Sequence, residues 1–130
     1  MRSVDTNIVV RFLARDDEHQ FRLANATLQS GDVWIAKTVL LETEWVLRSR
    51  YRLSPGEVHL ALSELLGLPG MAIEDPRNVA YALELFGHGL EFADALHLAS
   101  RPDGASFITF DEALVRRAKK AGATRVSAAE

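Results

Sequence analysis

Residues 2–7 of the chain read RSVDTN, and the apolar run IVVRFL follows at once at 8–13. The first part of this stretch is predicted to be a short strand that ends at a carboxylate, Asp5, and residues 7 to about 13 are predicted to be helical. The charged side chain of Asp5 is unexpected at a point where a buried strand passes into a helix. The same arrangement recurs at SFITF, residues 106–110, which is the clearest strand of the chain and is followed by Asp111.

The segments between these two strands alternate in type. Further strands are predicted at 32–36 and 71–74, with an edge strand at 124–127, and helices at 16–30, 38–51, 54–67, 75–87, 91–101 and 111–122. The helix at 54–67 has the plainest start, because Ser54 caps it and Glu57 completes a capping box. Alternating strands and helices predict an α/β fold, a three-layer α/β/α sandwich around a mainly parallel sheet of four to five strands. The 130 residues are predicted to form a single domain over 1–130.

The composition is that of an ordinary globular domain. Hydrophobic residues make up 48% of the chain, charged residues make up 25%, and the formal net charge is -3. The chain has no cysteine, which excludes disulfides and thiolate-bound zinc. No stretch approaches the roughly 20 apolar residues of a membrane span. We therefore expect a cytoplasmic protein without a membrane segment. Because the net charge is negative, a nucleic-acid ligand would require segregated charges or a bound metal ion.

Four acids stand where an acid is locally unexpected. Asp5 and Asp111 each end a predicted strand, and ligands of parallel sheets bind outside the carboxyl ends of the strands. Glu42 and Asp94 lie inside apolar helical segments, TVLLETEWVL and EFADALHLAS. An acid in such a segment is costly to bury unless it is paired or bound to a metal. Magnesium or manganese would resolve the conflict, because these ions take carboxylate oxygens as ligands.

Each acid taken alone also has an ordinary interpretation. Asp5 and Asp111 could be helix N-caps, and Asp94 could be solvated at the outer edge of its helix. Glu42 competes with Glu44 for the inward position, and one of the two is expected to be solvated. The combination of two acids at strand ends and two in apolar helices is what favours a metal site.

Four stretches in order carry a likeness to a known family: VDTNIVVRFL at 4–13, LLETEWVLRSRY at 40–51, EFADALHLAS at 91–100 and FITFDEALVRRA at 107–118. With these stretches the chain resembles PIN-domain ribonucleases, and particularly the VapC-like toxins of bacterial toxin–antitoxin pairs. The likeness extends over nearly the whole chain. It implies a metal-dependent endoribonuclease that hydrolyses RNA, that a cognate antitoxin protein holds inactive, and that forms a homodimer.

The resemblance also implies roles for individual residues. One or two Mg²⁺ or Mn²⁺ ions would be bound by Asp5, Glu42, Asp94 and Asp111, which are then both the metal ligands and the catalytic residues. Glu42 is preferred to Glu44 because it stands three residues before Trp45. Asn7 and Thr109 match polar positions that support the ligands.

Basic residues near the acids are candidates to hold RNA, with Arg11, Arg15 and Arg48 singled out from a wider set that includes Arg50. Most of this set is expected to be simply solvated. Trp45 is expected to belong to the core rather than to stack on a base.

Two other functions fit parts of the pattern. A phosphotransfer enzyme on a similar sheet would need a second aspartate at the position of Asn7, or a lysine where Asp111 stands. A non-catalytic or degenerate PIN-like binding module, whose acids are only caps, is the other alternative, and metal binding would separate it from an enzyme.

Overall fold

The computed structural model describes all 130 residues and contains seven helices and five strands. They divide between two compact units, Met1–Pro76 and Arg77–Glu130. None of the helices combines the length and the apolar character that a membrane crossing requires.

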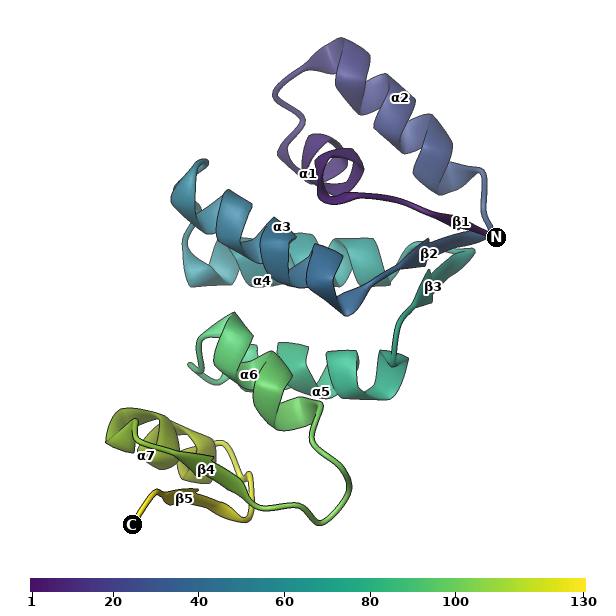
Figure 1. Cartoon of the computed structure of the whole chain (residues 1–130). Helices are drawn as coiled ribbons and strands as arrows, with labels where there is room; N and C mark the ends of the chain where they lie inside the picture. The colour runs from purple at the N-terminus through teal and green to yellow at the C-terminus, as the bar shows by residue number, and fades with distance from the viewer. The chain divides into compact units, whose positions relative to one another are not determined.

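The first unit contains a parallel sheet of three strands in the order β1-β2-β3 (Figure 1). These strands are β1 (Arg2–Ser3), β2 (Val33–Ile35) and β3 (Met71–Ile73). Ser3 pairs with Trp34, and Trp34 pairs with Ala72. The helices of this unit are α1 (Thr6–Ala14), α2 (Glu18–Gln29), α3 (Lys37–Ser49) and α4 (Pro55–Leu66). Each parallel pair is therefore joined by two helices, since parallel strands need a crossover connection.

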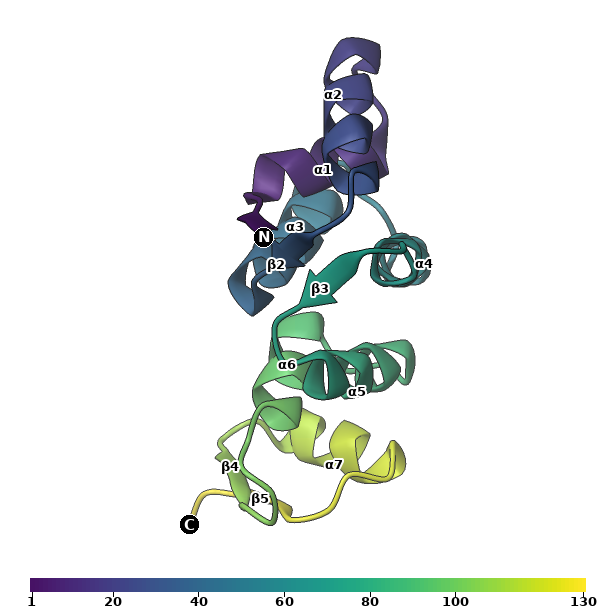
Figure 2. The same ribbon diagram turned by 90° about the vertical axis from the view of Figure 1, so that its right-hand side faces the viewer.

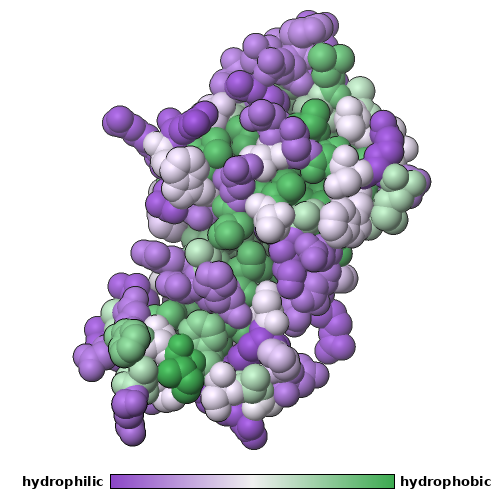
Figure 3. Space-filling view, in the orientation of Figure 1, coloured by the Kyte–Doolittle hydropathy of each residue, from purple (hydrophilic) through white to green (hydrophobic).

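Capping and packing residues explain where these helices lie. Ser54 and Glu57 form the predicted capping box of α4, with hydrogen bonds of 3.2 and 3.0 Å. Helix α2 buries only Ala24 and Leu28, and Figure 3 shows hydrophilic residues over its outer face at the top of the view. Helix α1 packs on both α2 and α3, and its Phe12 ring stacks on that of Phe21 with the centroids 5.9 Å apart. The start of α1 is thereby held beside α3.

The second unit pairs two parallel strands, β4 (Phe107–Thr109) and β5 (Val126–Ala128), with Phe107 opposite Val126. Helix α7 (Glu112–Lys120) connects these strands and packs on both of them (Figure 2). Two further helices precede β4, namely α5 (Pro76–Gly87), whose first residue is the last of the other unit, and α6 (Phe92–Ala99). The rings of Phe86 and Phe92 meet edge to face at 5.5 Å between centroids.

The predicted α/β class with parallel strands is confirmed. All five expected strands form and all their pairings are parallel, within a three-stranded and a two-stranded sheet. The expectation of one domain over residues 1–130 stays a prediction.

Candidate functional site

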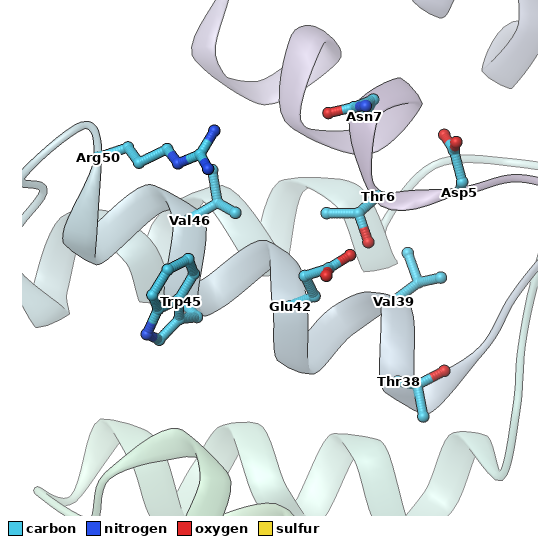
Figure 4. A pocket seen from close by; sticks show the side chains of 9 residues that line it. All are labelled: Asp5, Thr6, Asn7, Thr38, Val39, Glu42, Trp45, Val46 and Arg50. Carbon is cyan, nitrogen blue, oxygen red and sulfur yellow. The ribbon is translucent and has the colours of Figure 1, made fainter.

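A pocket of about 520 Å³ lies in the first unit, between the start of α1 and one side of α3 (Figure 4). It is lined by Asp5, Thr6, Asn7, Thr38, Val39, Glu42, Trp45, Val46 and Arg50. Two of the four acids singled out in the sequence therefore open onto the same cavity.

Asp5 is both a helix cap and a wall of this pocket. It is the N-cap of α1, and its Oδ1 accepts a hydrogen bond of 3.3 Å from the backbone N–H of Ile8. This bond satisfies one of the free N–H groups at the start of the helix and fixes the orientation of the carboxylate. The second oxygen, Oδ2, makes no hydrogen bond, so it is available to a ligand in the pocket.

Glu42 and Glu44 occupy opposite environments on α3. The buried face of the helix carries Leu40, Thr43, Glu44 and Leu47, whereas Glu42 is exposed to the pocket. Figure 4 shows the Glu42 side chain pointing from α3 toward Thr6 at the start of α1. Glu44 is only 4% exposed, and its Oε2 accepts a hydrogen bond of 2.8 Å from Nε of Arg48. One of the two glutamates is therefore exposed, as expected: it is Glu42, whereas Glu44 is a buried, paired residue.

Asp94 and Asp111 both belong to the second unit. Asp94 lies half-buried in the first turn of α6. Burial raises the pKa of Asp94, and the negative charges of Glu91 and Asp111 raise it further, against opposing effects of His97 and Arg117. Asp94 is thus not a freely solvated acid.

Asp111 lies between β4 and α7 and forms hydrogen bonds through both its side chain and its backbone. Its Oδ1 accepts a 3.0 Å hydrogen bond from the backbone N–H of Leu114, as expected of the N-cap of α7. Its own backbone N–H donates to Oγ1 of Thr109, also at 3.0 Å. Thr109 therefore fixes the backbone that carries Asp111.

The family model described as PIN domain matches residues 3–120. The chain belongs to the PIN-domain family. Searches of curated proteins and of solved structures found no significant match. PIN domains are generally nucleases that use divalent metal ions and act on RNA, so the family supports a nuclease.

The matched range of this PIN domain includes all four acids, and each unit contains one pair of them. Neither unit by itself gathers three Asp, Glu or His side chains closely enough to hold a metal ion. The donor atoms nevertheless suit magnesium or manganese, because they are carboxylate oxygens. Glu42 makes no ion pair, and neither does Asp5, so no protein cation competes with a metal for these two.

The three arginines predicted to hold substrate are engaged elsewhere in the PIN domain. Arg11 pairs with Asp16 at 3.1 Å and also donates to the Tyr51 hydroxyl at 3.3 Å. Arg15 pairs with Glu64 at 3.1 Å, and Arg48 pairs with Glu44. None of the three lines the pocket. A role for them in binding RNA would require these pairs to open.

Two other residues that line the pocket were not singled out as site residues from the sequence. Trp45 is 50% exposed, so the expectation that it belongs to the core is wrong. Arg50 follows the last turn of α3 and lines the same pocket, and its side chain makes no hydrogen bond or salt bridge. Asn7 also lines the pocket, with its side chain free of hydrogen bonds. Only the spacing of the buried residues along α3 could have shown that Trp45 is exposed. Trp45 lies two residues from both Thr43 and Leu47, so it does not share their buried face of the helix.

Proposed function

We propose that this PIN domain is a divalent-metal-dependent endoribonuclease that hydrolyses RNA phosphodiester bonds. One or two Mg²⁺ or Mn²⁺ ions would be held by Asp5, Glu42, Asp94 and Asp111. The observation that carries the proposal is the pocket, which brings two unpaired carboxylates from separate segments of a PIN-family chain to one cavity. Burial and the negative charges of Glu91 and Asp111 raise the pKa of Asp94, which supports the other pair, because a bound cation would relieve the repulsion between carboxylates.

A divalent ion held by these carboxylates would polarise a phosphoryl oxygen and lower the pKa of a water molecule that attacks the phosphorus. The protein supplies carboxylates that are oriented before substrate arrives. The hydrogen bond from Ile8 fixes Asp5, and the bonds to Leu114 and Thr109 fix Asp111 and its backbone. Either Asp94 or Asp111 orients the water, and no residue of the set serves as a covalent nucleophile.

Cleavage of total cellular RNA by the purified protein tests this proposal. We expect fragments in the presence of Mg²⁺ or Mn²⁺ and none in the presence of EDTA, with cleavage positions mapped by sequencing of the fragment ends. Binding of RNA without cleavage under any metal would favour a non-catalytic PIN-like module.

The biological part of the proposal is that the protein is the VapC-like toxin of a toxin–antitoxin pair. Its support is the resemblance of the four sequence stretches described above. A cognate antitoxin, a homodimer and a cytoplasmic location belong to the same proposal. Induced expression should then arrest growth of the host, and the Asp5→Asn variant should not. If the wild type and Asp5→Asn arrest growth to the same extent, the toxicity does not depend on the nuclease site.

The two glutamates of α3 should respond to substitution in opposite ways. Glu42→Gln should strongly reduce metal binding and cleavage with little effect on thermal stability, because Glu42 is exposed and unpaired. Glu44→Gln should cost about 1 kcal/mol of unfolding free energy with cleavage retained, since it weakens a charge-assisted hydrogen bond at a buried atom. Calorimetric metal titration and thermal unfolding of both variants measure this, and the reverse ranking would refute the choice of Glu42.

A further inference from the structure

The pocket has two chemically different ends along α3. Asp5 and Glu42 lie at one end, and Trp45 and Arg50 lie at the other (Figure 4). On a helix that rises 1.5 Å per residue, Trp45 stands about 4.5 Å and Arg50 about 12 Å beyond Glu42 along the axis. The second end is therefore within a few nucleotides of a phosphate held at the carboxylates.

The indole of Trp45 is the unusual feature of this end. Half of this residue is exposed to solvent in the cavity wall, although a large aromatic side chain in a helix is normally covered. An exposed aromatic ring beside a nucleic-acid site offers a flat apolar surface on which an unpaired base can stack.

Arg50 adds the only cation on the pocket wall, and it is unpaired. Lys37 at the other end of α3 pairs with Asp75 at 2.9 Å, as Arg48 does with Glu44. A free guanidinium in the same pocket as two carboxylates partly offsets their repulsion of a polyanion, and its planar fork matches phosphate oxygens.

We propose that Trp45 and Arg50 form a subsite for single-stranded RNA, in which Trp45 stacks on a base and Arg50 binds a phosphate within a few nucleotides of the bond that is cut. This inference rests on the proposed nuclease function and names two residues that position its substrate. Bases inside a duplex are already stacked on one another, so only an unpaired segment presents a face to the indole. The subsite positions substrate and takes no part in the chemical step.

The fluorescence of the two tryptophans tests the stacking directly. Besides Trp45 the chain has only Trp34, which does not line the pocket, so each Trp→Phe variant leaves one reporter. A short single-stranded RNA is titrated with Ca²⁺ in place of Mg²⁺ or Mn²⁺, and a gel confirms that the RNA stays intact. We expect RNA to quench the fluorescence of the wild type and of Trp34→Phe, and not that of Trp45→Phe. Quenching that persists in Trp45→Phe would overturn the stacking.

Binding of the same labelled RNA, followed by fluorescence anisotropy, measures the size of the effect. Trp45→Ala should weaken binding about 5- to 150-fold, and Trp45→Phe much less. Arg50→Gln should reduce the salt dependence of binding by about one phosphate contact, and Arg50→Lys should restore it. The matching duplex should bind more weakly than the single strand. Unchanged dissociation constants in Trp45→Ala and Arg50→Gln would refute the subsite.

Cleavage assays on the same RNA separate this inference from the proposed function. If the wild type cleaves RNA with metal but the Trp45 and Arg50 variants bind RNA as well as the wild type does, the subsite is refuted and the nuclease function stands. If the wild type neither binds nor cleaves RNA, both the subsite and the nuclease function are refuted. If Trp45→Ala instead abolishes self-association and leaves RNA binding intact, the exposed indole is a contact between copies of the chain and the subsite is wrong.

Discussion

Replacing Asp5 by asparagine is expected to abolish RNA cleavage while the protein stays folded. Asparagine has the shape of aspartate but lacks the charge that holds a divalent ion. A loss well beyond a hundredfold is expected, because even the loss of a residue that only supports a metal ligand typically costs about 10- to 100-fold. The amide oxygen can still accept the hydrogen bond from Ile8, since asparagine and aspartate are about equally good N-caps. Cleavage rates and thermal unfolding of purified protein free of wild type measure the two effects.

The chain provides a matched control in Asp17, the N-cap of α2. Its Oδ1 accepts a 2.9 Å hydrogen bond from the backbone N–H of Gln20, and it does not line the pocket. Asp17→Asn makes the same chemical change at the same kind of position, so it should leave cleavage unchanged. Equal activity of Asp5→Asn and Asp17→Asn would refute the assignment of the site.

The second large effect concerns metal and pH together. Because the pKa of Asp94 is raised in the fold, the metal-free folded protein binds more protons than the unfolded chain. Ionised Asp94 therefore costs stability at neutral pH, and this cost shrinks as the pH falls through the raised pKa. A divalent ion that binds only the folded site adds about 2.7 kcal/mol at a hundredfold excess over its dissociation constant. Protons compete for the same oxygens, so the gain in melting temperature from Mn²⁺ should be large near about pH 7–8 and fade near about pH 5.

Asp94→Asn should raise the melting temperature of the metal-free protein at neutral pH and reduce the gain from Mn²⁺. The favourable interaction of a negative charge with the first turn of α6 opposes the first effect, but it is small at a half-exposed site. Asp103 provides the control, because it is an exposed aspartate in a turn of the same unit. Asp103→Asn should leave the Mn²⁺ gain intact. A gain that is the same in wild type and Asp94→Asn at every pH would place the ion elsewhere.

Local signals in the sequence were sufficient for most elements of the fold. The capping box at Ser54 and Glu57 and the cap at Asp111 are short-range interactions, so the residues that form them are close in sequence as well. The strand at 107–109 and the parallel pairings follow from residue type and from the alternation of elements. Such features depend on residues that are close to one another in the sequence, so they can be predicted from it.

The parts that could not be predicted depend on the phase of a helix or on distant partners. Glu42 and Glu44 have the same apolar flanks, and only the buried face of α3 shows that Glu44 turns inward. The same phase exposes Trp45. Arg15 and Glu64 form an ion pair although they lie 49 positions apart in the sequence. The residues around Arg15 in the sequence therefore do not indicate that its charge is neutralised.

The double role of Asp5 and Asp111 has a practical consequence. Each carboxylate caps a helix through one oxygen, and asparagine can keep that bond. A protein carrying Asp5→Asn and Asp111→Asn should therefore be inert toward RNA and yet retain every helix start. With two negative charges fewer beside the substrate, it should also retain RNA longer than the wild type does. Such a variant would serve as a bait for isolating the natural RNA targets from cells, because it captures them without destroying them.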